Sequence, residues 1–338
     1  SALNALAKAS KNQNPYSHKD TIVTAFSDKD LQQLNKIYKS SHWVTFIEPK
    51  FDLSFFKKHQ EKEKDLLILH YSDQYSSSSS YDAITVTQRS DQYQMLIKEF
   101  LSERILDENK INTKHIINLF NSINGDWLLR LIGNKSHFGR EKLSILSAVK
   151  FSLAYFDHKN IIWVPISLEE ILRVSGAAGL KQREGIFSAK NLGLSGPQSD
   201  DILLIGVERD NDRIKLHYYP VEVKIGDVKE SIINKAVGQI DKTRTAIDKF
   251  LSKTTFRNAI YRDFLIQLLL VSAKKMRLYN IWNEKDWDSI IEGEIRTKLI
   301  NDDYEIVNDL NEYIHKGAII AFKKDTHFKS EKAIDNTL

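Results

Sequence analysis

The chain has 338 residues, enough for two domains of ordinary size, and its 41% apolar and 28% charged residues are typical of a globular protein. It contains no cysteine, which excludes disulfides and thiolate metal sites. No apolar run approaches the roughly 20 residues that cross a bilayer, and no signal peptide is visible, so we expect a cytoplasmic protein without a membrane partner.

The net charge of +4 is unevenly distributed along the chain. Residues 220–277 contain twelve Lys and Arg against six Asp and Glu, whereas residues 283–312 contain three against ten. A basic segment of this kind suits contact with a phosphate backbone. A solvated helix face explains any individual lysine equally well.

The N-terminal part of the sequence is predicted to form an α/β module. Residues 1–20 are polar and expected to be loosely ordered, and residues 21–110 are expected to form a layered accessory or coupling module. Asp28 is placed to cap the first helix. The predicted elements are a helix over 29–38, strands over 43–48, 65–71 and 82–87, a mobile serine-rich loop over 76–80, and a helix over 91–106.

Residues 111–330 are expected to form a second domain with a mixed sheet flanked by helices. The predicted elements are helices over 113–124, 126–132 and 139–156, a strand over 159–165, a short helix over 168–174, a hairpin near 202–224, helices over 231–251 and 262–279, and a strand over 318–322. The segment Gly133-Asn134-Lys135-Ser136 lacks the second glycine of a phosphate-binding loop, so no NTPase centre is expected.

The hairpin is the most informative feature of the chain. Asp200 and Asp201 open an apolar strand, and Glu222 and Lys224 close the returning one on a shared face, because side chains alternate along a strand. A turn of two residues, 211–212, places Asp201 opposite Glu222, and a turn of four residues keeps Asp201 on the same face. An odd turn would bring Asp200 there instead. Even turns dominate tight hairpins, so Asp201 is favoured over Asp200.

Two carboxylates and a lysine at the ends of paired strands can hold a divalent cation against a phosphate. Asp201 and Glu222 would supply carboxylate oxygens and Val223 a backbone carbonyl oxygen, a ligand set that suits Mg²⁺ or Mn²⁺. The cation would activate a water and neutralise charge on the phosphate, and Lys224 would orient that water or stabilise the transition state. The same short pattern also fits a surface hairpin with a solvated Glu and Lys.

This arrangement resembles the metal-dependent nucleases known by the motif PD-(D/E)xK, whose minimal order is helix, three strands, helix and strand. The resemblance implies a restriction-endonuclease-like fold and a metal-binding Glu on the first core helix, where Glu141 lies; the helix dipole alone would also favour a Glu there. Gln239 matches a glutamine of RecB-like nucleases, although Thr243 stands where their pattern has Tyr. A helix-surface amide is the alternative for Gln239.

The residues that would follow a nucleic-acid backbone are Lys235, Lys242 and Arg244, which lie on the helix after the hairpin. The sequence segments 42–49, 70–74, 166–173 and 200–204 resemble the C-terminal part of DptH-type phosphorothioation-dependent restriction proteins of bacteria. That resemblance implies the nuclease end of a defence system, with a translocase or ATPase region of the same longer protein, or other subunits, as partners. The first residue is Ser1 rather than Met, which fits a fragment of a longer chain.

These observations predict a Mg²⁺- or Mn²⁺-dependent DNA endonuclease that hydrolyses phosphodiester bonds. The main rival is a catalytically inactive nuclease-like module that binds nucleic acid or a partner protein. A nuclease directed at RNA is a third reading, because the backbone chemistry is shared. A homo-oligomer is compatible with the prediction, since many double-strand cutters of this superfamily dimerise.

Overall fold

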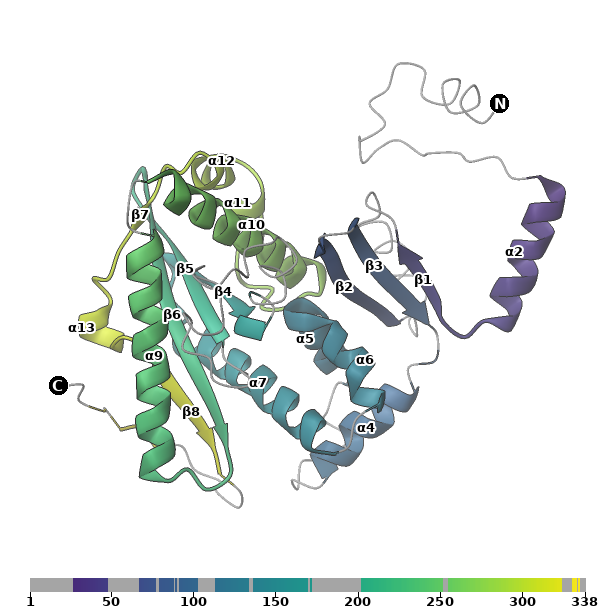
Figure 1. The fold of residues 1–338 in the computed structure, drawn as a ribbon, viewed down its shortest axis with the longest axis horizontal. Helices are drawn as coiled ribbons and strands as arrows, with labels where there is room; N and C mark the ends of the chain where they lie inside the picture. The colour runs from purple at the N-terminus through teal and green to yellow at the C-terminus, as the bar shows by residue number, and fades with distance from the viewer. Residues whose placement is uncertain are drawn as a thin grey trace. The chain divides into compact units, whose positions relative to one another are not determined.

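The computed structural model of the protein describes residues 27–47, 67–76, 79–87, 89, 91–102, 113–133, 136–169, 171, 202–251, 255–323, 330–332 and 334. It has an α/β architecture with a three-stranded and a five-stranded sheet, both accompanied by helices (Figure 1). Its contacts divide the chain into two compact units, Ser1–Val44 and Thr45–Leu338. Each unit is described by itself.

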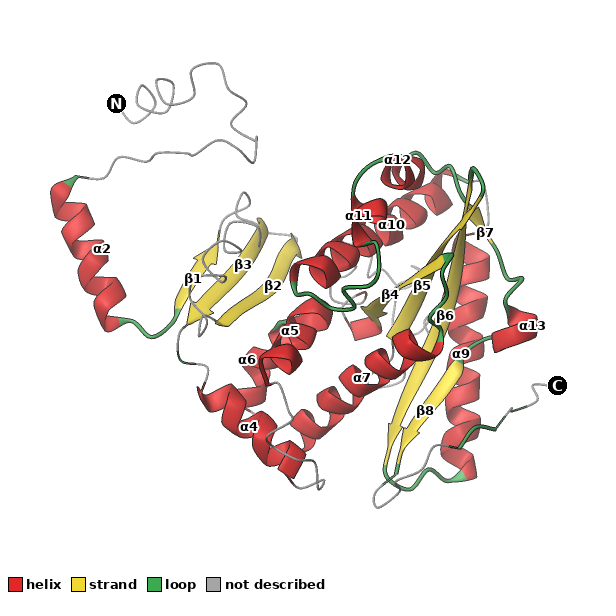
Figure 2. Cartoon of the chain, turned by 180° about the vertical axis from the view of Figure 1, so that it is seen from behind, coloured by secondary structure: helices red, strands yellow, loops and turns green. Residues whose placement is uncertain are grey.

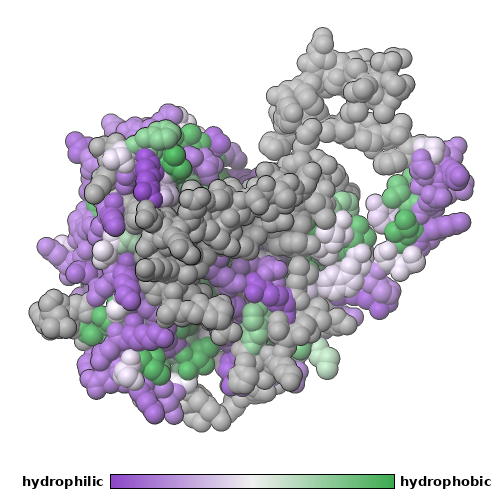
Figure 3. All heavy atoms as spheres, in the orientation of Figure 1, coloured by the Kyte–Doolittle hydropathy of each residue, from purple (hydrophilic) through white to green (hydrophobic). Residues whose placement is uncertain are grey.

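The first unit contains the helix α2 (Asp28–Ser40). Ser27, rather than the predicted Asp28, is the N-cap, because its side-chain oxygen accepts a hydrogen bond of 3.1 Å from the backbone N–H of Asp30. None of the residues of α2 is buried. Figure 3 shows hydrophobic residues among hydrophilic ones on this helix, in keeping with the exposure of Leu31 and Ile37.

The three-stranded sheet is formed by β1 (Val44–Ile47), β2 (Leu67–Ser76) and β3 (Ser79–Thr87), in the order β1-β3-β2. The strands β2 and β3 are antiparallel and pair as far as Ser76 with Ser79. The serine-rich segment therefore belongs in part to the two strands, which corrects the prediction of a loop over 76–80; residues 77 and 78 lie outside the described part.

The helices α4 (Asp91–Ser102), α5 (Thr113–Asn124) and α6 (Asp126–Gly133) accompany this sheet. Both α5 and α6 contact β2, and the side-chain amide of Asn121 donates a hydrogen bond to the carbonyl of Ile68. The buried residues Ile117 and Phe120 belong to α5. Because helices of the predicted second domain cover a strand of the predicted first one, the contacts divide the chain after Val44 and not near residue 110.

The five-stranded sheet is mixed. The antiparallel strands β4 (Ile161–Ser167), β5 (Ile202–Asp210) and β6 (Arg213–Ile225) lie side by side, and the short strands β7 (Glu305–Ile306) and β8 (Ala318–Phe322) both pair with β6 in parallel. Asp210 pairs with Arg213 across the two-residue turn 211–212. The even hairpin turn predicted from the sequence is thus confirmed.

Helices cover both faces of this sheet (Figures 1 and 2). Phe156, just after α7 (Ser136–Tyr155), packs on Tyr219 with ring centroids 4.8 Å apart. Ile240 of α9 (Glu230–Leu251) and Pro220 flank the same glycine of the loop before β8. Because Tyr219 and Pro220 are neighbours on β6 and point to opposite faces, α7 and α9 lie on opposite sides of the sheet.

The end of the chain is more helical than expected. The helix α10 (Phe256–Leu278) starts six residues before the predicted 262, because Thr255 caps it by accepting a hydrogen bond from the N–H of Asn258. The short elements α11 (Trp287–Ile291), α12 (Glu294–Ile300), α13 (Asn311–Ile314) and β7 were not predicted. No helix in the described part of the chain is both long enough and apolar enough to traverse a bilayer.

Candidate active site

Glu222 and Lys224 form a close ion pair at the carboxyl end of β6, the central strand of the five-stranded sheet. The ammonium nitrogen of Lys224 lies 2.6 Å from a carboxylate oxygen of Glu222, on one face of the strand as predicted. Glu222 is 3% exposed, and its backbone pairs with Ile319 of β8. A carboxylate removed from water to this extent needs a cationic partner, and here the lysine is that partner.

The acidic residues predicted to complete this site, Asp200 and Asp201, lie outside the described residues. The described ladder between β5 and β6 ends at the pair of Ile202 and Val221, one position before Asp201 and Glu222. In the described part of the chain no group of three or more His, Cys, Asp or Glu could hold a metal. The choice between Asp201 and Asp200 therefore stays a prediction.

Gln239 lies at the flank of the sheet-facing side of α9 and is half-buried. Arg244 reaches the carbonyl of Tyr218, and Ile240 lies near Pro220, so α9 runs antiparallel to β6 and its earlier turns approach Glu222. The side-chain oxygen of Gln239 is buried without a hydrogen-bond partner in the described structure. A buried, unpaired acceptor beside a candidate active site is available to a ligand, a water or a lysine.

Arg244 does not belong to the predicted DNA-binding surface. It is 7% exposed, and its guanidinium donates to the carbonyl of Tyr218 and to the side-chain oxygens of Asn308 and Asn311, the latter two at 2.6 and 3.0 Å. Burial lowers the pKa of this guanidinium. Arg244 therefore binds the protein's own acceptors, which corrects the expectation. Lys235, in contrast, is exposed.

Lys242 is also exposed on α9, so the structure leaves Lys235 and Lys242 accessible to a partner. Val223 is 7% exposed and pairs with Ile320 of β8. The backbone carbonyl of Val223 stays a candidate metal ligand. Of the predicted site residues, the structure brings together Glu222, Val223 and Lys224 on β6, with α9 and its Gln239 covering the face of Glu222.

Glu141 is placed differently from the expectation. The helix α7 begins at Ser136, so Glu141 lies beyond its first turn and the dipole argument for a first-turn Glu loses its basis. This helix covers the face of the sheet opposite to Glu222. The carboxylate of Glu141 lies 3.5 Å from the ammonium of Lys142, at the edge of a second polar cluster.

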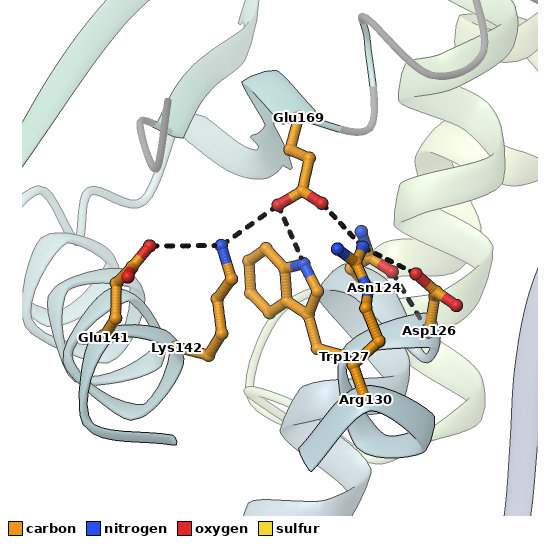
Figure 4. A network of polar contacts seen from close by, with 7 residues as sticks. All are labelled: Asn124, Asp126, Trp127, Arg130, Glu141, Lys142 and Glu169. Atoms are coloured by element: carbon orange, nitrogen blue, oxygen red, sulfur yellow. Dashed lines mark hydrogen bonds and ion pairs between the residues drawn. The ribbon is translucent and has the colours of Figure 1, made fainter. Parts of the chain in front are cut away.

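That second cluster, which the sequence did not reveal, is centred on Glu169 just after β4 (Figure 4). Glu169 accepts hydrogen bonds from the indole N–H of Trp127 at 3.1 Å, from Arg130 at 2.7 Å and from Lys142 at 3.0 Å. Lys142 is 3% exposed, and its ammonium lies 4.7 Å from the ring centroid of Trp127. The cluster joins α6 and α7 to the end of β4.

The electrostatics of this cluster predict an acid-sensitive contribution to stability. Burial acts to raise the pKa of Glu169, but Lys142 and Arg130 outweigh it and hold this pKa below its usual value of 4.5. A carboxyl with a depressed folded-state pKa stabilises the fold above its unfolded pKa and loses that contribution as the pH falls through the lower value.

We therefore expect Glu169→Gln to destabilise the protein at pH 7 by on the order of 1 kcal/mol. The difference from the wild type should shrink as the pH falls below about 4. Urea unfolding at neutral and acid pH measures both effects, with Glu312→Gln at an exposed position as the control. A difference that does not depend on pH would contradict the assignment.

Comparisons with known proteins add no relative. No protein-family model matches the chain, and no curated protein or solved structure matches it significantly. The function proposed below is accordingly argued from the residues of this chain and their geometry.

Proposed function

We propose that this protein is a metal-dependent DNA endonuclease that hydrolyses phosphodiester bonds. One observation carries the proposal: a carboxylate that is 3% exposed and a lysine 2.6 Å away share one face at the end of the central strand of a covered sheet. A purely structural strand gains little from such a pair, since an apolar pair of the same size is often at least as stable. A site that handles cations and phosphates needs both charges.

In the proposed site Asp201 and Glu222 hold the metal, together with the backbone carbonyl of Val223. Carboxylate and carbonyl oxygens are the ligands that Mg²⁺ and Mn²⁺ prefer, so Glu222 and the carbonyl of Val223 have suitable chemistry, and Asp201 would supply the second carboxylate. When bound, the ion supplies charge neutralisation and an acidified water. Lys224 stabilises the charge that develops on the phosphate. Gln239 supports the site from α9, whereas Glu141, on the helix that covers the opposite face of the sheet and beside Lys142, has no part in the proposed metal site.

The order of elements supports the same proposal. The helix α7, the strands β4, β5 and β6, the helix α9 and the strand β8 follow one another as in a restriction-endonuclease-like core, with α10 to α13 and β7 inserted before β8. The two-residue hairpin turn is the geometry that favours Asp201 over Asp200 as partner of Glu222.

The biological setting that we propose comes from the resemblance to DptH-type proteins. In that setting the nuclease acts in the bacterial cytoplasm on DNA that lacks phosphorothioate modification. Its partners would be a translocase or ATPase region of the same longer protein, or other subunits of the defence system.

The hydrolase proposal is tested with plasmid DNA and the purified protein in Mg²⁺, Mn²⁺ or EDTA. We expect nicking or linearisation that requires the metal and is abolished by Asp201→Ala and by Glu222→Ala, whereas Glu312→Ala cuts like the wild type. Intact DNA in every metal, with binding unchanged in both active-site variants, would overturn the proposal and favour a catalytically inactive binding module.

A further inference from the structure

Three lysines form a straight line on the exposed surface of α9. Lys235, Lys242 and Lys249 are spaced by seven residues and are all exposed. Seven residues are close to two helical turns, so the three side chains project from nearly the same side and span about 21 Å of the helix. Asp241 and Asp248 also repeat every seven residues, but they lie about 100° further around the helix and form a separate line.

Small residues accompany this lysine line. Ser231, Gly238 and Thr245 each precede one of the lysines by four positions and therefore lie beside the line. Gly238 is the informative one, because a Cβ added there would meet no atom of the described structure within 4 Å. Glycine is unfavourable in the interior of a helix, and here internal packing does not require it. A binding partner that comes close to the helix backbone would require a residue without a side chain at this position.

The lysine line begins beside the candidate active site. The helix α9 follows β6 after a short turn and runs antiparallel to it, so the first of the lysines, Lys235, lies nearest to the Lys224 end of the strand. Gln239 projects from α9 between the lysine line and the sheet-facing side, with its buried, unpaired oxygen. A DNA strand that leaves the candidate active site can thus continue along the lysine line.

We infer that the sugar-phosphate backbone of DNA runs along α9 over Lys235, Gly238, Lys242 and Lys249 and enters the active site at the Lys224 end. The inference rests on the proposed function for its substrate. The lysines would neutralise three phosphates, and the missing side chain of Gly238 would let the backbone come close to the helix.

The lysines are tested by the fluorescence anisotropy of a short labelled DNA duplex, in Ca²⁺ without Mg²⁺, over a series of salt concentrations. Replacing all three lysines by Gln should weaken binding on the order of 100-fold at 0.1 M salt and reduce the salt slope by about 2.7. The matched control replaces three exposed lysines of other elements by Gln: Lys114, Lys150 and Lys159. Equal losses in the two triple variants would overturn the inference.

Gly238 is tested separately, because its replacement changes no charge. Gly238→Gln should raise the melting temperature slightly, since Gln is the better helix former. It should nevertheless weaken DNA binding about tenfold, because the new side chain fills the space that the DNA backbone would occupy. Binding equal to that of the wild type would contradict the role of Gly238. Because these assays measure binding alone, metal-dependent cleavage by the wild type with normal binding of the lysine triple variant would overturn this inference and leave the proposed function intact.

Discussion

Replacing Lys224 by Met should nearly abolish DNA hydrolysis and at the same time strengthen metal binding. In the structure the lysine neutralises Glu222 at 2.6 Å, so a metal ion that takes this carboxylate must displace the ammonium. Without Lys224, the carboxylate lacks its cation and gains more from the metal, by about tenfold in affinity or more. In the proposed site Lys224 is the charge that faces the phosphate, so its loss should lower the cleavage rate by about 10²–10³.

The two effects are measured independently. Titration calorimetry with Mn²⁺ gives the affinity in the absence of DNA, and plasmid cleavage under saturating metal gives the rate. Lys159→Met, at an exposed lysine before β4, controls for the loss of one positive charge. An unchanged affinity in Lys224→Met would show that the lysine does not compete with the metal. Cleavage within a few-fold of the wild type would remove Lys224 from the chemistry.

The hairpin could be predicted from sequence because its determinants are local. The turn residues 211–212 fix an even register, and alternation along β6 then places Glu222 and Lys224 on one face. The long helices and β8 were found for the same reason, since their apolar periodicity or β-branched composition is contained within each segment. A pattern held within one segment needs no knowledge of the tertiary structure.

The features that escaped prediction depend on contacts between distant segments. Glu169 gathers Trp127, Arg130 and Lys142 from two helices that precede it by 27 to 42 positions, and no spacing rule connects them. The short elements α11 to α13 lack enough residues for a recognisable period. Arg244 shows the same limit most clearly, because an arginine among lysines on a basic helix suggests a phosphate contact until its burial is known.

Arg244 is expected to be a major contributor to the stability of the sheet edge. The strands β7 and β8 pair with β6 at 215–216 and at 221–225, and the stretch of β6 between them has no strand partner on that side in the described structure. The guanidinium of Arg244 occupies this gap and donates to the carbonyl of Tyr218. It also binds Asn308 and Asn311, which precede β8. The Arg244 side chain thus takes the place of backbone hydrogen bonds along this stretch of β6. It also holds the segment that leads into β8.

Replacing Arg244 by Met should therefore lower the free energy of unfolding by about 3 kcal/mol, because the buried carbonyl and amide oxygens lose a charged donor. Urea unfolding followed by circular dichroism measures this loss. Arg213→Met, at an exposed position at the start of β6, is the matched control and should change stability by less than about 0.5 kcal/mol.

Arg244→Lys separates the structural role from a role in DNA binding. A phosphate contact needs only a positive charge, which lysine keeps, whereas a bridge between three acceptors needs the planar fork of donors that only arginine has. We expect Arg244→Lys to lose most of the stability that Arg244→Met loses, with no change in the salt slope of DNA binding at temperatures where the variant is folded. If Arg244→Lys keeps full stability and binds DNA more weakly, Arg244 contacts DNA and the structural role is contradicted.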